Sequence, residues 1–130
     1  MIRVLVADDH SIVRDGLKRI LAATPDLQVA GEAASGDEAL ALVRANDYDI
    51  AMLDMSMPGL SGIDLIKRLK LEKPKLRILV LSMHGESQYA ARALKAGAQG
   101  YLNKDSASEA LLARSTRIAT TPMNPFGHAR

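Results

Sequence analysis

The sequence contains no cysteine and no tryptophan, and it has only three tyrosines and one phenylalanine among 130 residues. Without cysteine, the chain cannot form a disulfide scaffold, a cysteine-ligated zinc site, an iron–sulfur cluster or a cysteine nucleophile. So few aromatic rings also argue against a surface on which the bases of a single nucleic-acid strand stack. The 17 Lys and Arg against 15 Asp and Glu leave a formal charge of +2. So small an excess does not indicate a nucleic-acid or membrane surface.

Long apolar segments are also absent. No uninterrupted apolar run exceeds residues 39–43, whereas a membrane-spanning helix needs about 20 apolar residues. The start of the chain has no signal-peptide pattern. With 48% apolar and 25% charged residues, the composition is that of an ordinary folded domain. We therefore expect a single soluble, cytoplasmic domain with no membrane contact.

Short apolar segments recur about 25 residues apart along the chain. They are residues 4–7, 27–33, 50–53, 78–81 and, more weakly, 99–102. Between them the apolar residues follow the period of a helix, as Val13, Leu17 and Leu21 do on one face of the first such segment. This alternation predicts five strand–helix units, and hence a parallel sheet with helices on both faces.

Helix ends are marked by capping residues. Ser35 with Glu38, and Ser106 with Glu109, have the spacing of capping boxes that begin the second and fifth helices. Gly97 is expected to end the fourth helix in a left-handed conformation. We interpret His10 as a helix-entry residue. On the first helix, we interpret the basic residues 14, 18 and 19 as an ordinary solvated face.

The composition of the strands predicts their order. Segments 4–7, 50–53 and 78–81 are apolar at every position, as strands covered on both faces must be. Segment 27–33 alternates between apolar and polar residues, and segment 99–102 begins with Gln99 and Gly100, so both are expected at the edges. With right-handed crossovers and the second and fifth strands outermost, the natural arrangement is the strand order 2-1-3-4-5, which matches a known topology. The predicted fold is a flavodoxin-like (βα)5 doubly wound parallel sheet.

Polar residues follow the predicted strands at the edge where parallel α/β sheets bind ligands. Asp8 and Asp9 follow the first strand, and Asp54 follows the third. Ser82 follows the fourth strand, and Lys104 lies just past the fifth. Three carboxylates at one point repel one another unless a cation lies among them. Oxygen ligands favour Mg²⁺ or a similar hard ion over zinc.

This set strongly resembles the receiver domain of bacterial two-component response regulators, over residues 1–117. The similar segments are Val-Ala-Asp-Asp-His at 6–10, Leu-Asp-Met-Ser-Met-Pro-Gly-Leu-Ser-Gly at 53–62, Leu-Ser-Met-His at 81–84, and Gly-Ala-Gln-Gly-Tyr-Leu-Asn-Lys-Asp at 97–105. They are most similar to regulators of the nitrate-response and quorum-sensing type, which carry a C-terminal helix-turn-helix DNA-binding domain.

The resemblance implies that Asp54 is the phosphoacceptor, with a sensor histidine kinase or a small phosphodonor as the partner. Asp8, Asp9, Asp54 and the main-chain carbonyl of Ser56 would hold Mg²⁺, and Lys104 would neutralise charge on the phosphoryl oxygens. Such a protein is a substrate that assists its own modification and not an enzyme acting on other molecules.

The resemblance also implies a switch. Ser82 would bond the attached phosphoryl group, and Tyr101 would change rotamer with it. Ser56 and His84 match two variable positions that tune dephosphorylation. The surface around the fourth helix, fifth strand and fifth helix would change, normally to control a transcriptional output domain absent from this chain. We expect a weak homodimer and no direct nucleic-acid binding by this chain.

The same residues allow three alternative interpretations. The acids could be helix-cap or turn residues, although this reading is weak for three acids at neighbouring strand ends. A phosphohydrolase of the haloacid-dehalogenase kind would need a second acid where Ser56 stands. A flavodoxin would need a loop rich in Ser, Thr and Gly where Asp8 and Asp9 stand. One departure from the receiver pattern is Asp105, because the family usually has proline there, often after a cis peptide bond.

The last residues break the helical pattern. The apolar face of the fifth helix should continue near position 115, but Ser115 and Thr116 stand there, followed by a segment rich in Thr, Pro and Asn. We expect residues 118–130 to be a disordered tail, a linker or a cloning artefact, with the receiver domain confined to residues 1–117.

Overall fold

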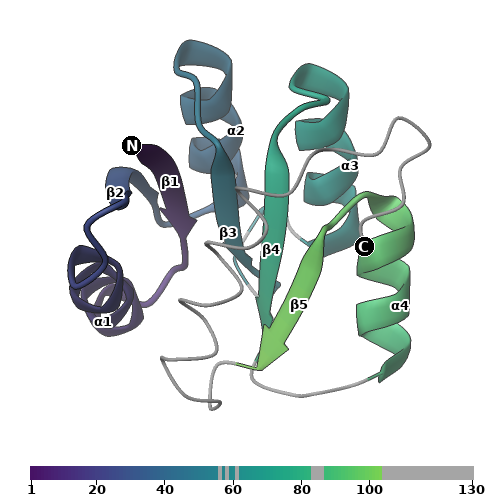
Figure 1. Ribbon diagram of the computed structural model, residues 1–130. Helices are drawn as coiled ribbons and strands as arrows, with labels where there is room; N and C mark the ends of the chain where they lie inside the picture. The colour runs from purple at the N-terminus through teal and green to yellow at the C-terminus, as the bar shows by residue number, and fades with distance from the viewer. Residues whose placement is uncertain (56, 58, 61, 83–86, 104–130) are drawn as a thin grey trace.

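A five-stranded parallel sheet is flanked by helices in the computed structural model (Figure 1), which describes residues 1–55, 57, 59–60, 62–82 and 87–103. The elements are β1 (Ile2–Ala7), α1 (Ser11–Ala22), β2 (Leu27–Ala33), α2 (Gly36–Ala45), β3 (Ile50–Asp54), α3 (Gly62–Glu72), β4 (Arg77–Ser82), α4 (Ser87–Ala96) and β5 (Gly100–Asn103). The predicted fifth helix and the segment 118–130 lie outside the described residues.

The strand order is β2-β1-β3-β4-β5, which confirms the predicted order 2-1-3-4-5. All strand pairs are parallel. Every residue of β3 is buried, whereas Gln28 and Glu32 on the edge strand β2 are exposed. Apolar residues at consecutive positions thus mark a strand covered on both faces, and alternation marks an edge.

Three strands begin at other residues than predicted, and β4 is one of them, since it starts at Arg77, one residue early. β1 starts at Ile2, two residues early, because Ile2 pairs with Leu27 and its N–H donates to the Asp26 carbonyl at 2.8 Å. β5 starts at Gly100, one residue late. Gln99 nevertheless bonds to β4 from both its main chain and its side chain: its N–H donates to the Ile78 carbonyl, and its Oε1 accepts from the Ile78 N–H, each at 2.8 Å.

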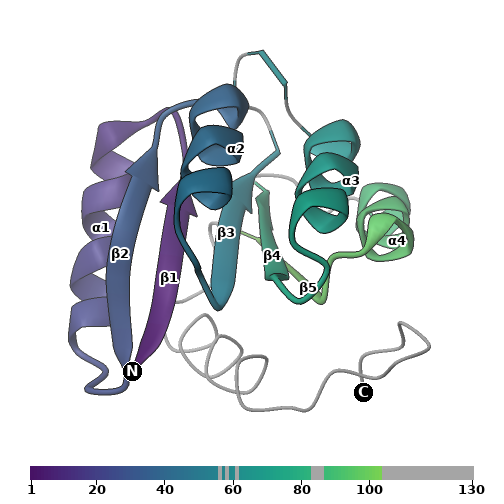
Figure 2. The ribbon, with the colours of Figure 1, turned by 90° about the horizontal axis from the view of Figure 1, so that it is seen from above.

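The hydrophobic core has two parts, one on each face of the sheet. On one face, Leu17 and Leu21 of α1 pack against Val4, Met52 and other residues of the central strands. On the other face, α2, α3 and α4 lie side by side (Figure 2) and cover alternate residues of the same strands. The two parts therefore use opposite sides of each central strand, as the period of two in a strand requires.

The predicted helix ends are confirmed where they are described. The Glu38 N–H donates to Ser35 Oγ at 3.2 Å at the start of α2. In return, the Glu38 carboxylate accepts from the N–H of Ala34, one residue before the cap, at 3.1 Å. Gly97 follows α4 with φ of 123°, a conformation that glycine adopts without strain. The second predicted capping box, Ser106 with Glu109, lies outside the described residues.

Within the part of the chain described, no helix combines the length and apolarity needed to cross a membrane.

Candidate functional site

The register of the two central strands brings Asp8 and Asp54 side by side at the carboxyl edge of the sheet. Ala7 pairs with Leu53, so Asp8 and Asp54 are the next residues along neighbouring strands. The Asp8 N–H donates to the Ala33 carbonyl at 3.0 Å, which extends the pairing with β2 by one residue. Asp8 is fully buried and Asp54 is 1% exposed. Burial of two carboxylates at one point is costly unless positive charge or donors compensate them, which makes this edge of the sheet a candidate cation site.

Four potential metal ligands meet here. Asp8, Asp9, His10 and Asp54 each offer one ligand atom, and these atoms all lie within 4.8 Å of one another. The three carboxylates are those predicted from their positions at the strand ends. His10 is the residue before α1, as its helix-entry interpretation predicts, but its ring also joins the carboxylates. Apart from the adjacency of Asp8, Asp9 and His10, nothing in the sequence signals this contact.

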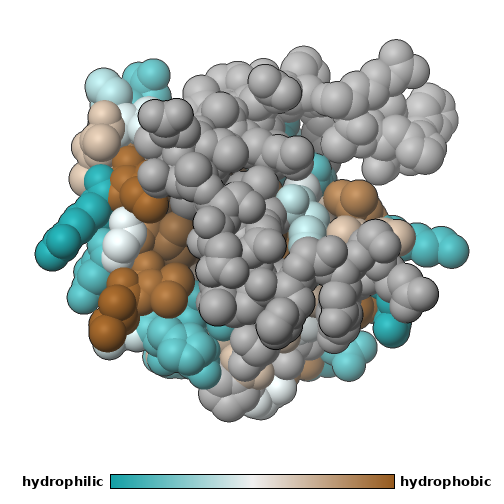
Figure 3. Space-filling model, turned by 90° about the horizontal axis from the view of Figure 1, so that it is seen from below, coloured by the Kyte–Doolittle hydropathy of each residue, from teal (hydrophilic) through white to brown (hydrophobic). Residues whose placement is uncertain are grey.

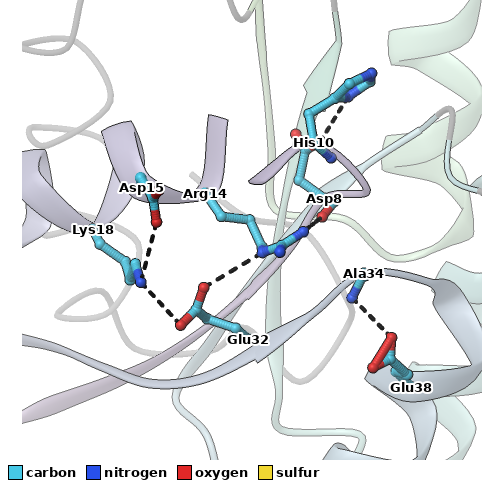
Figure 4. Close-up of polar contacts among 8 residues, drawn as sticks. All are labelled: Asp8, His10, Arg14, Asp15, Lys18, Glu32, Ala34 and Glu38. Carbon is cyan, nitrogen blue, oxygen red and sulfur yellow. Dashed lines mark hydrogen bonds and ion pairs between the residues drawn. The ribbon is translucent and has the colours of Figure 1, made fainter. Parts of the chain in front are cut away.

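The His10 ring faces both acids of the preceding loop. Its Nδ1 lies 3.1 Å from Asp8 Oδ1 and 3.0 Å from Asp9 Oδ1. The His10 main-chain N–H also donates to Asp8 Oδ1, at 2.9 Å (Figure 4). The imidazole is 62% exposed, and the Asp9 side chain is 30% exposed. The site is therefore open to solvent on the side of Asp9 and His10 and closed on the side of Asp8 and Asp54.

A chain of charged side chains anchors the loop that carries the acids (Figure 4). Arg14 donates from Nη1 to the main-chain carbonyl of Asp8, and its Nε lies 3.4 Å from Glu32 Oε1 on β2. Lys18 contacts the other oxygen of Glu32 at 3.1 Å and Asp15 at 3.3 Å. Hydrogen bonds to Glu32 and then to Asp15 raise the pKa of the Lys18 ammonium above its usual value.

Arg14 corrects one interpretation made from the sequence. We expected residues 14, 18 and 19 to form an ordinary solvated face, but the Arg14 side chain is only 19% exposed and contacts the site loop. Its partner Glu32 lies 18 positions later, on a neighbouring strand. Arg14 on α1 and Glu32 on β2 come together only in the fold, in which β2 pairs with β1, the strand that leads into α1.

The segment that follows Asp54 packs against the start of α2. A Cβ atom on the buried Gly36 would lie 1.5 Å from the Leu60 carbonyl oxygen. A Cβ atom on Gly59, whose φ is 74°, would lie 2.5 Å from Asp37 Oδ2. Glycine at 36 therefore permits the close approach of this segment, which leads from the site to α3.

The structure describes only some of the other predicted site residues. Ser82 ends β4, where it pairs with Asn103 of β5, and its side chain lies outside the described part of the structure. Tyr101 pairs with Val80 and is partly buried against the core on the face covered by α2, α3 and α4. Ser56, His84 and Lys104 lie outside the described residues. The structure thus brings together the three carboxylates and leaves the remaining predicted roles untested.

The carboxyl edge of the sheet also has an apolar margin. Seen from this side (Figure 3), brown apolar side chains are visible where α1 lies, and Ile12 at the start of α1 is 84% exposed. An apolar side chain in the first turn of α1 therefore lies two residues from His10 in the sequence.

Comparisons with known proteins agree with this arrangement. Residues 4–116 match the family described as the response regulator receiver domain. The response regulator UvrY of Escherichia coli K12 is 38% identical over 109 residues, which are 84% of this chain and 50% of UvrY. The chain thus spans about half the length of the curated relatives it matches.

Solved structures agree as well. The signal receiver domain of the putative response regulator NarL from Mycobacterium tuberculosis is 35% identical with a TM-score of 0.87, covering 93% of this chain and 98% of that one. A response regulator protein from Burkholderia pseudomallei, solved with a phosphorylated aspartic acid, a calcium ion and citrate, is 32% identical with a TM-score of 0.76, covering 87% and 65%. The resemblance drawn from the sequence is therefore confirmed: the chain belongs to the response regulator receiver domain family of two-component signalling, and its relatives are of the nitrate-response type.

Proposed function

We propose that this receiver domain is a phosphorylation switch in which Asp54 accepts a phosphoryl group from a sensor histidine kinase or a small phosphodonor. The observation that carries the proposal is the position of Asp54 at the end of a fully buried strand, directly beside the buried Asp8. A carboxylate held there has little rotational freedom and is oriented before the donor arrives. The proposed domain covers residues 1–117 and acts in the cytoplasm.

The acidic residues fit a small divalent cation. Asp8, Asp9 and Asp54 offer carboxylate oxygens, the ligands that Mg²⁺ prefers, and their ligand atoms lie within 4.8 Å of one another. We assign Asp8, Asp9 and Asp54 to this cation, with the main-chain carbonyl of Ser56 as the family resemblance implies. Bound Mg²⁺ would supply positive charge that offsets the negative charge on the phosphoryl oxygens.

The chain itself would perform the remaining steps. One carboxylate oxygen of Asp54 forms the bond to phosphorus while the bond from phosphorus to the donor breaks and the donor keeps the electron pair. Lys104 is assigned the second positive charge beside the phosphoryl oxygens. Ser82 is assigned the hydrogen bond to the phosphoryl group once it is attached, and Tyr101 the rotamer change that follows. In this scheme the protein is modified itself and turns over no other substrate.

The proposed readout is a change in the surface formed by α4, β5 and the fifth helix. Relatives about twice as long contain further sequence beyond the matched region, and we propose that the switch controls a DNA-binding output domain in the whole protein. This chain's own region would bind no nucleic acid and would form at most a weak homodimer.

Incubation with acetyl phosphate and Mg²⁺ tests the proposal directly. The wild-type chain should gain one phosphate that is stable in acid and labile in base, and Asp54→Asn should gain none. The Asp9→Asn variant should bind Mg²⁺ much more weakly than the wild type in a titration without phosphodonor. Continuous release of phosphate with no phosphate retained on the chain would favour a hydrolase instead, and labelling that persists in Asp54→Asn would remove Asp54 from the role.

A further inference from the structure

We infer that Glu32 on β2 is a positioning residue for the loop that carries Asp8 and Asp9, and that it acts through Arg14. The inference rests on the proposed function, because the loop matters only if its acids bind a divalent cation. It concerns how firmly that cation is held, whereas the phosphoacceptor role of Asp54 is independent of it.

A β-bulge in β2 precedes Glu32. Val4 of β1 pairs with Val29, but the next residue of β1, Leu5, pairs with Gly31, so β2 contains one extra residue at this point. A bulge bends its strand and redirects the side chains that follow it.

The bulge turns Glu32 toward α1. Residues that pair in parallel strands direct their side chains to the same face of the sheet, and successive residues alternate between the faces. Glu32 pairs with Val6, which packs in the part of the core on the α1 face, as Val29 does before the bulge. With regular pairing beyond Val29, Glu32 would lie opposite Ala7, which faces the part of the core under α2, α3 and α4. The extra residue therefore keeps this charged side chain out of that part of the core and directs it to α1.

Two basic side chains of α1 hold the Glu32 carboxylate (Figure 4). Glu32 Oε1 lies 3.4 Å from Arg14 Nε, and Oε2 lies 3.1 Å from Lys18 Nζ. Arg14 donates from Nη1 to the main-chain carbonyl of Asp8. Glu32 thus reaches the acidic loop through one intervening side chain and is not itself among the potential metal ligands of the described residues.

The charge of Arg14 makes its contact with Glu32 matter for a cation. A guanidinium bonded to the Asp8 carbonyl places a positive charge beside the acids, and like charges repel. The Arg14 side chain is 19% exposed, so solvent screens this charge only in part. Glu32 offsets the charge and fixes the guanidinium, which leaves the negative charge of the loop available to a divalent cation. Loss of the Glu32 carboxylate should therefore weaken cation binding without moving Asp54, which β3 holds.

A double-mutant cycle followed by Mg²⁺ titration of the unphosphorylated chain tests the inference. The variants are Glu32→Gln, which nearly keeps the shape of the side chain, Arg14→Gln, and the two together. The matched control is Asp15→Asn, which removes the other acid that Lys18 contacts. We expect Glu32→Gln to weaken Mg²⁺ binding about threefold, less than the roughly tenfold loss expected for a direct partner of the loop. With Arg14 already replaced, the same change should have almost no further effect, and Asp15→Asn should have little effect in either background.

Labelling with acetyl phosphate gives a second readout. In Glu32→Gln, the Mg²⁺ concentration that gives half of the maximal labelling rate should rise. The maximal rate at saturating Mg²⁺ should equal that of the wild type, because Asp54 is unchanged. A damaged fold would lower the maximal rate as well, and circular dichroism of each variant checks the fold directly.

The outcomes separate the two claims. The positioning role is wrong if Glu32→Gln binds Mg²⁺ as the wild type does, if it loses the same factor with and without Arg14, or if Asp15→Asn weakens binding equally. A lower maximal labelling rate in an intact Glu32→Gln variant would also overturn it. In each of these cases, weaker Mg²⁺ binding by Asp9→Asn and labelling at Asp54 leave the proposed function standing. If the wild type neither binds Mg²⁺ nor gains phosphate, the proposed function fails as well.

Discussion

At the scale of single residues, Arg14 is the side chain that holds the acidic loop in place. Its guanidinium donates to the Asp8 carbonyl and contacts Glu32 on β2, so it ties the loop to the edge of the sheet. Removal of this donor should allow Asp8 and Asp9 to spread apart, because their mutual repulsion is then opposed by fewer contacts. Arg14 is a positioning residue in this interpretation, since it acts on the metal through the loop.

We therefore predict that Arg14→Gln weakens Mg²⁺ binding roughly tenfold, the lower end of the effect seen when a partner of a metal ligand is lost. Isothermal titration measures the change. The matched control is Arg19→Gln, which removes the same charge from an exposed position later in α1. Equal losses in the two variants would mean that the positive charge of Arg14 matters and its contact with the loop does not.

The acidic residues of the site could be predicted from the sequence, whereas their supporting contacts could not. Asp8, Asp9 and Asp54 follow apolar segments. Strand pairing brings such residues together at the edge of a parallel sheet, independently of the conformation of their side chains. The contacts of Arg14 and His10 depend instead on the direction of each side chain around one loop. No periodicity in the sequence encodes those directions.

At the scale of elements, two glycines allow the same substitution to be compared in two settings. At Gly36, the first residue of α2, a Cβ atom would lie 1.5 Å from the Leu60 carbonyl oxygen and 2.6 Å from its carbonyl carbon. At Gly16 inside α1, a Cβ atom would meet nothing within 4 Å.

We predict opposite effects on stability. Gly36→Ala should lower the free energy of unfolding by about 1–3 kcal/mol or more, because the backbone of the segment after β3 must move. Gly16→Ala should raise it by roughly 0.5–1 kcal/mol, because alanine restricts the unfolded chain and favours the helix. Urea denaturation at equilibrium measures both. A stabilised Gly36→Ala variant would show that this segment does not pack closely on α2.

The pair formed by Arg44 of α2 and Glu72 of α3 predicts a pH dependence. Arg44 Nη2 lies 2.7 Å from Glu72 Oε1, and this hydrogen bond lowers the pKa of the Glu72 carboxyl below 4.5. Between the folded pKa of Glu72 and pH 4.5, this carboxyl binds fewer protons in the folded chain than in the unfolded chain. The ion pair therefore stabilises the fold above pH 4.5, and this stabilisation is lost as the pH falls through the folded pKa. Unfolding midpoints of the wild type and Glu72→Gln should differ near neutral pH and converge in acid. If the unfolding midpoints of the two proteins differ by the same amount from neutral pH to acid, the stabilisation does not come from the ionised Glu72 carboxylate.

The edge and central strands were predictable because composition reports burial strand by strand, whereas the order among the central strands came from matching a known topology. β1, β3 and β4 are apolar throughout their central residues, and β2 carries Gln28 and Glu32 on its exposed positions. The ends of strands were less predictable. Gln99 bonds to Ile78 through a side-chain oxygen, which replaces a main-chain partner and shifts where β5 begins.

At the scale of the whole molecule, the proposed phosphorylation of Asp54 would change the charge at one edge of the sheet. It would add roughly one to two negative charges and three acceptor oxygens beside Asp8 and Asp9. Ser82 lies at the end of the neighbouring strand β4, and Tyr101 lies on β5 opposite Val80. A change at Ser82 would therefore pass to β5 through direct strand pairing, and then to α4, whose Leu94 is 49% exposed.

We predict that a beryllofluoride mimic of the phosphoryl group, with Mg²⁺, shifts the wild-type chain toward a weak dimer and changes amide exchange in α4 and β5. The shift should be smaller in Ser82→Ala, because the hydroxyl that closes on the phosphoryl group is missing while the charge of the mimic is the same. Light scattering and amide exchange on the wild type and Ser82→Ala, each with and without the mimic, measure both effects. If size and exchange are identical in all four samples, the added charge is compensated at the site itself. The surface of α4 and β5 then takes no part in the response.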